Sequence, residues 1–152
     1  MTYCDSSFLA ALYQPTDVFH PHACEVASAF TSSIPYTLLN ELELLNTLSR
    51  CLGNRSLDQA AHDSILRVID ADKAEGLLEK TSLNQIKVYE KAREISKKHT
   101  PALACRSLDI LHVAAALVLG ARNFASLDLR QRKLAEAVKL KLLPSRLPLA
   151  QT

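Results

Sequence analysis

The feature that most constrains this chain is the segment from Cys105 to Leu129, CRSLDILHVAAALVLGARNFASLDL. Between residues 108 and 119 only Asp109 and His112 are polar, so a helix formed here has no solvated face. A helix that is apolar on all sides is a buried helix. Because Gly120 is a typical helix end, the sequence predicts one buried helix that stops there.

A second carboxylate follows that helix. Residues 123–127 predict a short buried strand, and Asp128 comes directly after it. Removing one ionised carboxylate from water costs roughly several kcal/mol even after relaxation. Asp109 and Asp128 therefore each require a partner, or they take up a proton.

The composition indicates an ordinary globular protein. The chain has 152 residues, of which 48% are hydrophobic and 22% charged, enough for one domain with a substantial core. No uncharged run reaches the length of a membrane span, and no signal peptide opens the chain, so we expect a cytoplasmic protein without a membrane partner. The four cysteines are widely spread, which favours buried thiols over disulfides or a zinc site.

Charge is divided unevenly along the chain. Residues 1–79 carry four Lys and Arg against eleven Asp and Glu, whereas residues 80–152 carry fourteen against five. Such asymmetry is typical of proteins that bind an anionic partner such as nucleic acid. A set of surface helices that happen to be basic explains it equally well.

Short apolar strands alternate with helices along the chain. The predicted strands are residues 1–4, 34–36, 123–127 and 140–143. The predicted helices are residues 8–13, 16–30, 38–52, 56–75, 82–99, 107–119 and 129–138. This order favours an α/β sandwich around a short, mostly parallel sheet, with a folded domain over residues 1–143 and a loose tail over residues 144–152.

Helical periodicity also predicts which side chains face the core. In the helix at 38–52 the predicted core stripe is Leu38, Leu42, Leu45 and Leu52, with Glu41 on the same side as Leu45. In the basic helix at 82–99 the predicted inward residues are Ile86, Tyr89, Ala92 and Ile95, with Lys87, Lys91, Lys97 and Lys98 outward.

Four carboxylates fall where a strand or loop gives way to a helix: Asp5, Glu41, Asp109 and Asp128. Each one alone is explained by helix capping or by the helix dipole. Capping explains all four together less well. In a parallel sheet the strand-to-helix junctions lie at the carboxyl edge, where α/β proteins place their sites. Four acids at one edge repel one another, and proteins usually offset such repulsion by binding Mg²⁺ or Mn²⁺ between the carboxylates.

The same residues resemble a known family. Asp5-Ser6-Ser7, Glu41 after Pro-Tyr-Thr, Arg106-x-x-Asp109-Ile-Leu-His112 and Ser126-Leu-Asp128 are similar to motifs of the PIN-domain nucleases, above all the toxin ribonucleases of VapBC-type toxin–antitoxin pairs. The resemblance runs from Thr2 to about Leu143. It implies a PIN-like three-layer sandwich and an endoribonuclease that depends on Mg²⁺ or Mn²⁺.

The resemblance also implies roles and partners. Asp5, Glu41, Asp109 and Asp128 would be the acidic quartet, with Asp5 and Asp109 as direct metal ligands and with Ser7 and Ser126 in support. The implied partners are an RNA substrate, a small antitoxin and a second copy of the chain. The segment 14–33 departs from the family pattern.

Several residues keep two interpretations. Arg106 and Arg130, with Arg132 and Lys133, flank the expected site, where they either hold RNA phosphates or are solvated charges. His112 is either a satisfied core histidine or a contact of Asp109. For the whole chain, the alternative to a nuclease is a non-catalytic PIN-like module that binds RNA or protein.

Overall fold

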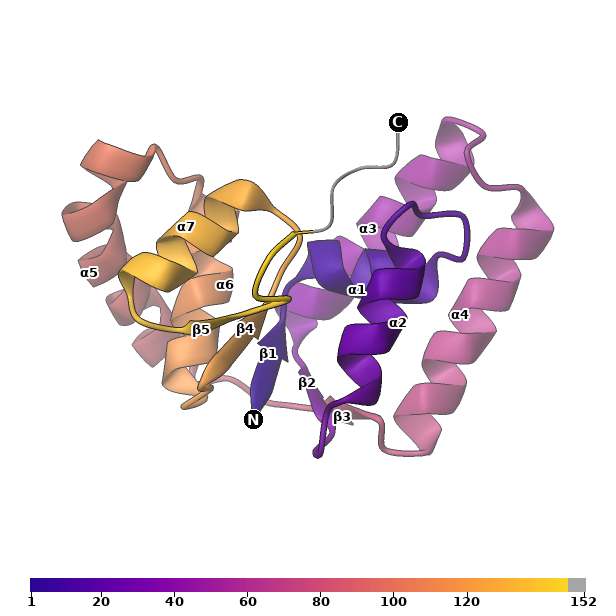
Figure 1. The fold of residues 1–152 in the computed structure, drawn as a ribbon, viewed down its shortest axis with the longest axis horizontal. Coiled ribbons are helices and arrows are strands. Elements are labelled where there is room, and N and C mark those ends of the chain that lie inside the picture. The colour runs from indigo at the N-terminus through magenta and orange to yellow at the C-terminus, as the bar shows by residue number, and fades with distance from the viewer. Residues whose placement is uncertain (148–152) are drawn as a thin grey trace. The chain divides into compact units, whose positions relative to one another are not determined.

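The computed structural model describes residues 1–147, which form two compact units (Figure 1). One unit comprises Met1–Asp5 and Ser82–Leu147, and the other comprises Ser6–Thr81. The first carries thirteen Lys and Arg against six Asp and Glu, and the second carries five against ten. We call them the basic unit and the acidic unit. The charge division along the chain is therefore also a division between compact parts of the fold.

The basic unit contains a three-stranded parallel sheet of order β1-β4-β5. Its strands are β1 (Thr2–Cys4), β4 (Asn123–Ala125) and β5 (Lys141–Leu143). Its helices are α5 (Gln85–Leu103), α6 (Ser107–Val118) and α7 (Leu129–Ala137). Tyr3 lies opposite Phe124 in the register of β1 and β4, and their rings stack with centroids 5.8 Å apart.

The acidic unit is mostly helical. It contains α1 (Ser6–Tyr13), α2 (His20–Ser28), α3 (Leu38–Gly53) and α4 (Gln59–Ala74). A two-stranded parallel sheet of β2 (Ile34–Tyr36) and β3 (Leu78–Lys80) completes it. Thr37 caps α3 by accepting a hydrogen bond from the backbone of Asn40, and Asp58 caps α4 in the same way through Ala61.

The predicted fold class is confirmed: the chain is a mixed α/β protein with short parallel sheets flanked by helices. The predicted buried helix is α6, in which a row of fully buried alanines, Ala114 to Ala116, lies in the core of the basic unit. His112 on the same helix is fully buried and bonds the Tyr3 hydroxyl at 2.9 Å through Nδ1, as a core histidine does.

The predicted core stripe of α3 is wrong. Leu38 and Leu42 are 64% and 67% exposed, and the helix buries Asn40, Leu44 and Leu48 instead. The helix carries leucines on more than one face, and the side that packs is chosen by contacts with α1 and α4 that the helical period does not contain.

The basic helix also differs from its prediction. Ile86 and Tyr89 on α5 are exposed, and the buried residues are Val88, Ala92 and Ile95. The helix runs through Pro101 to Leu103, and the chain then turns at Ala104 with a positive φ of 49°.

Other predictions meet mixed outcomes. Strand β3 was absent from the predicted elements, and α2 begins at His20 rather than at Thr16. All four cysteines are free thiols, but only Cys4 is buried as expected, whereas Cys24, Cys51 and Cys105 are half-buried. The part of the predicted tail beyond residue 147 lies outside the described residues. Within the described residues, no helix is both long and apolar enough to cross a membrane.

Candidate active site

The carboxyl edge of the sheet in the basic unit brings together two of the predicted site segments. The Asp5 amide donates a hydrogen bond to the Ala125 carbonyl oxygen at 2.9 Å, and the Ser126 amide donates to the Leu143 carbonyl oxygen at 3.0 Å. The chain therefore leaves β1 and β4 side by side. Asp5 and the segment from Ser126 to Asp128 lie at the edge where parallel α/β sheets carry their sites.

Asp5 is fully buried and lies near one buried cation. Arg132 on α7 is also buried, and its guanidinium donates to the carbonyl oxygens of Ser126, Leu143, Pro144 and Ser145 at 2.8 to 3.4 Å. Burial lowers the pKa of Arg132, and the Asp5 carboxylate acts in the opposite direction by favouring the charged guanidinium. Arg132 therefore anchors the backbone beside Asp5. It is not available to hold RNA phosphates, which corrects one of its two interpretations.

Asp128 caps helix α7 through only one of its carboxylate oxygens. Its Oδ1 accepts from the amides of Arg130 at 2.7 Å and Gln131 at 3.1 Å, which caps α7. The Asp128 amide donates to Ser126 Oγ at 3.1 Å, so Ser126 supports this turn. Within residues 1–147 these capping hydrogen bonds use Oδ1 and not Oδ2, so capping and a ligand role are compatible.

Asp109 is buried in the first turn of α6 and also makes a capping contact. Its Oδ2 accepts from the Arg106 amide at 3.0 Å. Burial, followed by the negative charge of Asp109, raises the pKa of the neighbouring Cys105 thiol. The carboxylate thus affects its surroundings as a charge, while one of its oxygens is held by the backbone.

The other two predicted residues lie in the acidic unit. Glu41 stands in the first turn of α3, and its Oε1 is 3.0 Å from Nζ of Lys73 on α4. Ser7 lies in the first turn of α1 and is partly buried. Lys73 was not among the predicted site residues, because its partner is 32 positions away and only the fold brings them together.

The residue types of these acids suit a metal site, but their arrangement in this structure does not form one. Carboxylates are the ligands that Mg²⁺ and Mn²⁺ prefer. Nevertheless, among residues 1–147 no group of three or more His, Cys, Asp or Glu side chains is placed to hold a metal ion. Asp109 and Asp128 each give one oxygen to a backbone amide, and Glu41 is paired with Lys73. In this structure the acids therefore have protein partners.

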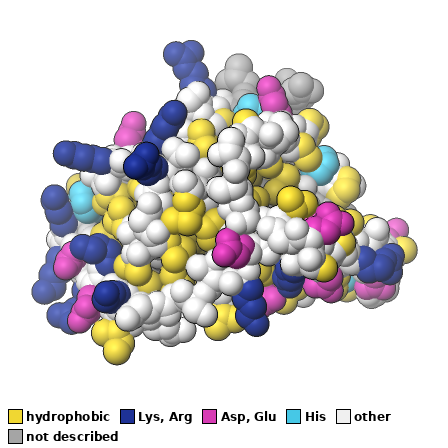
Figure 2. All heavy atoms as spheres, turned by 90° about the horizontal axis from the view of Figure 1, so that it is seen from below, with side chains coloured by type: hydrophobic (Ala, Val, Ile, Leu, Met, Phe, Trp, Pro, Cys, Tyr) yellow, Lys and Arg dark blue, Asp and Glu magenta, His cyan; other side chains and the backbone are white. Residues whose placement is uncertain are grey.

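Several basic side chains lie on the surface of the basic unit. Figure 2 shows Lys and Arg gathered at the left, on the side where Figure 1 places α5. Arg106, Arg130 and Lys133 are exposed, as are Lys87 and Lys98 of α5. These side chains are free to contact an anionic polymer.

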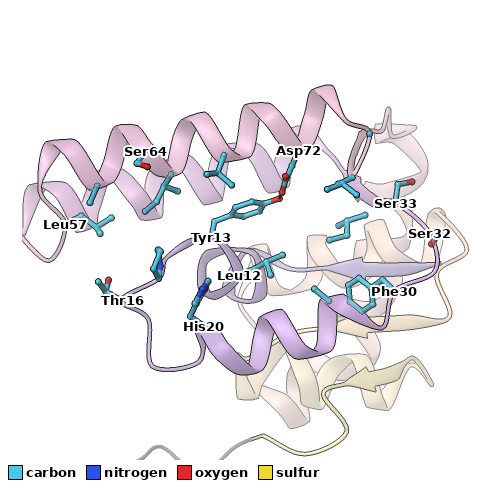
Figure 3. Close-up of a pocket in the computed structure, with 18 of the residues that line it drawn as sticks. Leu12, Tyr13, Thr16, His20, Phe30, Ser32, Ser33, Leu57, Ser64 and Asp72 are labelled. Atoms are coloured by element: carbon cyan, nitrogen blue, oxygen red, sulfur yellow. The ribbon is translucent and has the colours of Figure 1, made fainter.

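The acidic unit holds an apolar cavity of about 840 Å³ that the sequence did not reveal (Figure 3). It is lined by parts of α1, α2 and α4 and by the segment that follows α2, including Leu12, Ile65 and Phe30. Tyr13 and Asp72 point toward each other at its wall, where the Tyr13 hydroxyl donates to Asp72 Oδ2 at 2.6 Å. The segment 14–33, which departs from the family pattern, supplies much of one side of this cavity.

Comparison with known proteins adds one likeness. No protein-family model matches the sequence, and no curated protein matches it. The crystal structure of Mycobacterium tuberculosis VapC20, described as a Sarcin-Ricin loop cleaving toxin, matches with a TM-score of 0.64 and 17% sequence identity. The match covers 88% of this chain and 94% of that chain. The chain therefore has the fold of the VapC-type PIN-domain toxins.

Proposed function

We propose that this chain is an endoribonuclease that depends on Mg²⁺ or Mn²⁺ and acts as the toxin of a toxin–antitoxin pair. The observation that carries the proposal is the likeness of fold to a toxin described as cleaving the Sarcin-Ricin loop, over nearly the whole of both chains. The family motifs at Asp5, Asp109 and Asp128, and the place of Asp5 and Asp128 at one sheet edge, support it.

In this proposal Asp5, Glu41, Asp109 and Asp128 are the acidic quartet, and Asp5 and Asp109 bind the metal directly. Ser7 and Ser126 support the site by hydrogen bonding. When bound, such an ion supplies the positive charge that neutralises a scissile phosphate and makes a water molecule acidic enough to attack near neutral pH. The capping of α7 is compatible with this role of Asp128, because the capping contacts use Oδ1 and not Oδ2.

The substrate contacts are assigned to the basic unit. Arg106 and Arg130 are exposed and stand next to Asp109 and Asp128 in the sequence, which suits them to hold RNA phosphates without reading the bases. The surplus of positive charge in this unit would draw RNA toward the site.

A small antitoxin is the proposed partner of the acidic unit. The apolar cavity has the size of a ligand or side-chain binding site, and the unit around it has twice as many acidic as basic residues. An amphipathic helix with apolar anchors and a basic rim would be complementary in both respects. A second copy of the chain would cover the exposed Leu38, Leu42 and Leu45 on α3. We place the protein in the cytoplasm.

The test is RNA cleavage by wild type and by Asp109→Asn. Asparagine keeps an oxygen that can accept from the Arg106 amide, so the cap survives while the charge is lost. We expect the variant to lose activity by at least about a hundredfold, as removal of a group that stabilises transition-state charge does. Incubation with bulk RNA and Mg²⁺, followed by gel analysis, measures the loss.

Asp58→Asn is the matched control, because Asp58 caps α4 by accepting from the Ala61 amide at 2.7 Å. It should cleave RNA at the wild-type rate. Equal activity of wild type and Asp109→Asn would contradict the site assignment. A wild-type protein that binds RNA but never cleaves it would favour the rival, a non-catalytic PIN-like module.

A further inference from the structure

Helix α5 of the basic unit carries an exposed aromatic ring that the proposed function does not use. Of the eight tyrosines and phenylalanines in the chain, all of them within residues 1–147, only Tyr89 is exposed. It is 58% exposed, whereas Tyr3 and Phe124, the other aromatic residues of the same unit, are fully buried. Aromatic rings on a surface are typical of binding sites, because each offers a large and rigid contact area.

Two positive charges continue from Tyr89 along the same face of α5. Arg93 and Lys97 follow at intervals of four residues, and both are exposed. Residues four apart on an α-helix form one row, with a spacing of about 6 Å along the axis. Among residues 1–147 neither Arg93 nor Lys97 makes an ion pair. The row therefore presents one aromatic face and two cations that no acid of the described chain neutralises.

The acids of α5 lie on the adjacent row. Glu90 and Glu94 are four residues apart, and Glu94 is already paired with Lys91, whose Nζ lies 2.5 Å from its Oε2. The row of Tyr89, from Gln85 to Pro101, contains no acidic residue. The face that Tyr89 shares with its two cations is therefore positive.

An aromatic ring followed by two cations has the chemistry that binds single-stranded RNA. The unstacked bases of a single strand stack on exposed aromatic rings, and cations beside the ring bind the phosphates. A second copy of the chain is a poorer occupant, because a symmetric contact through this face would bring two positive rows together. The surplus of thirteen Lys and Arg over six Asp and Glu in this unit also favours a polyanion.

Tyr89 lies far along α5 from the acids of the proposed site. It precedes Leu103, the last residue of the helix, by 14 positions, which is about 21 Å at 1.5 Å per residue. Asp109 follows that end of α5 in the chain, in the first turn of α6. Tyr89 is thus placed to hold RNA away from the scissile phosphate, so it should affect binding and leave the chemical step unchanged.

We propose that Tyr89, Arg93 and Lys97 form an RNA-binding row. Tyr89 stacks on one unpaired base, and the two cations hold phosphates next to it. Tyr89 is a positioning residue, because it holds the substrate without taking part in the cleavage. This inference rests on the proposed function, since it takes single-stranded RNA as the substrate.

The first experiment measures binding of a short single-stranded RNA of mixed sequence by fluorescence anisotropy, in an Asp109→Asn background that does not cleave it. Tyr89→Ala should weaken binding about tenfold, which is within the range for one stacked base. It should not change the slope of log affinity against log salt, because stacking releases no counterions. Tyr89→Phe keeps the ring and should bind as the parent does. Replacing Arg93 and Lys97 by Gln should lower the slope by about 1.4, at about 0.7 for each phosphate contact.

Ile86→Ala is the matched control, because Ile86 is an apolar residue of the same helix and is 73% exposed. It should bind RNA as the parent does. Equal losses in Ile86→Ala and Tyr89→Ala would mean that apolar area matters and the ring does not, which overturns the proposal. Unchanged affinity in Tyr89→Ala, or no RNA binding by the parent, overturns it as well. A lower mass of Tyr89→Ala in sedimentation, with RNA affinity unchanged, would assign this face to a second copy of the chain.

Photocrosslinking gives a direct readout with the same RNA carrying 5-iodouridine, which joins to an aromatic ring on which it stacks. Mass spectrometry should place the adduct on Tyr89, and adducts found only on other residues contradict the proposal.

Cleavage kinetics separate this proposal from the proposed function. In the cleaving protein Tyr89→Ala should raise KM about tenfold and leave kcat unchanged. If wild type cleaves RNA, Asp109→Asn does not, and Tyr89→Ala keeps the wild-type KM, the nuclease proposal stands and this one falls. If wild type never cleaves RNA but binds it through the Tyr89 ring, the nuclease proposal falls and this one stands.

Discussion

The two units of this chain differ in how completely they are filled. The basic unit closes on one core, in which Tyr3, Val113, Phe124 and Leu134 are fully buried. The acidic unit buries residues of comparable size but leaves an apolar cavity of about 840 Å³. A closed core under a basic surface suits a site for an anionic polymer, whereas an open apolar cavity under an acidic surface suits a protein partner.

The same contrast applies to the cations beside the predicted site residues. Arg132 of the basic unit is buried and holds four backbone carbonyls, while Lys73 of the acidic unit is one-third exposed and shares its charge among several partners. The comparison teaches that a cation near a carboxylate is either a buried part of the scaffold or a partly exposed surface partner. Burial and anchoring decide which.

The largest effect is expected from Arg132→Met. Removing the guanidinium leaves the carbonyl oxygens of Ser126, Leu143, Pro144 and Ser145 without that donor. It also leaves Asp5 without the nearby positive charge. We expect a loss of about 3 to 5 kcal/mol in the free energy of unfolding, the range for breaking a buried charged contact. Urea denaturation followed by circular dichroism measures it.

Arg130→Met is the control within the same helix, because Arg130 is exposed. Its expected change is within about 0.5 kcal/mol. If both variants lose the same stability, Arg132 is no more a part of the scaffold than a surface arginine, and the contrast with Lys73 fails.

Much of the basic unit follows from sequence patterns. The strands β1 and β4 and the buried helix α6 lie where short apolar runs and an all-apolar helical segment predicted them. The positions of Asp5 and Asp128 at one edge also follow, because Asp5 comes directly after β1 and Asp128 comes three residues after the end of β4. Local sequence patterns are enough to locate a helix or strand where apolar residues fill the whole segment.

Tertiary contacts decide what the patterns leave open. Helix α3 has two faces that are about equally rich in leucine, formed from Leu38, Leu42, Leu44, Leu45 and Leu48. Tertiary packing buries the face with Leu44 and Leu48. The pair of Lys73 and Glu41, and the cavity, depend on where α3 and α4 meet, which no local period encodes. Capping and ligand roles use the same residue types, so sequence could not separate them at Asp109 or Asp128.

The next effect concerns RNA binding. Replacing Lys87, Lys91 and Lys98 of α5 by Gln in an Asp109→Asn background should weaken binding of a short single-stranded RNA by about tenfold at physiological salt. The slope of log affinity against log salt should fall by about 2, because each phosphate contact contributes about 0.7. Fluorescence anisotropy at several salt concentrations measures both.

The matched control removes three arginines from the acidic unit, Arg50, Arg55 and Arg67, all of them exposed. Its total charge changes by the same amount, yet the salt slope should stay at the value of the Asp109→Asn background. Equal losses in the two triple variants would mean that RNA senses only the net charge of the chain, and the functional contrast between the units would be lost.

The smallest expected effect is a difference between the two units in how the free energy of unfolding depends on pH. Burial, and then the Asp5 charge, raises the pKa of the Cys4 thiol in the basic unit, and burial raises that of the Tyr36 phenol in the acidic unit. In both cases the folded state keeps a proton that the unfolded state loses, so each group reduces stability as pH rises above its ordinary pKa. These ordinary values are about 8.5 for a thiol and about 10 for a phenol.

Between pH 8.5 and 9.5 the Cys4 thiol should lower stability by about 1 kcal/mol, in addition to the contribution of Cys105, whose pKa is also raised. Cys4→Ala should therefore flatten the decline in stability over this window, and Tyr36→Phe should flatten it only above about pH 10. Urea denaturation at half-unit steps of pH measures both slopes relative to wild type. If the stability of Cys4→Ala falls from pH 8.5 as steeply as that of wild type, the Cys4 thiol ionises within the folded basic unit. The core of the basic unit would then be less closed than its burial indicates.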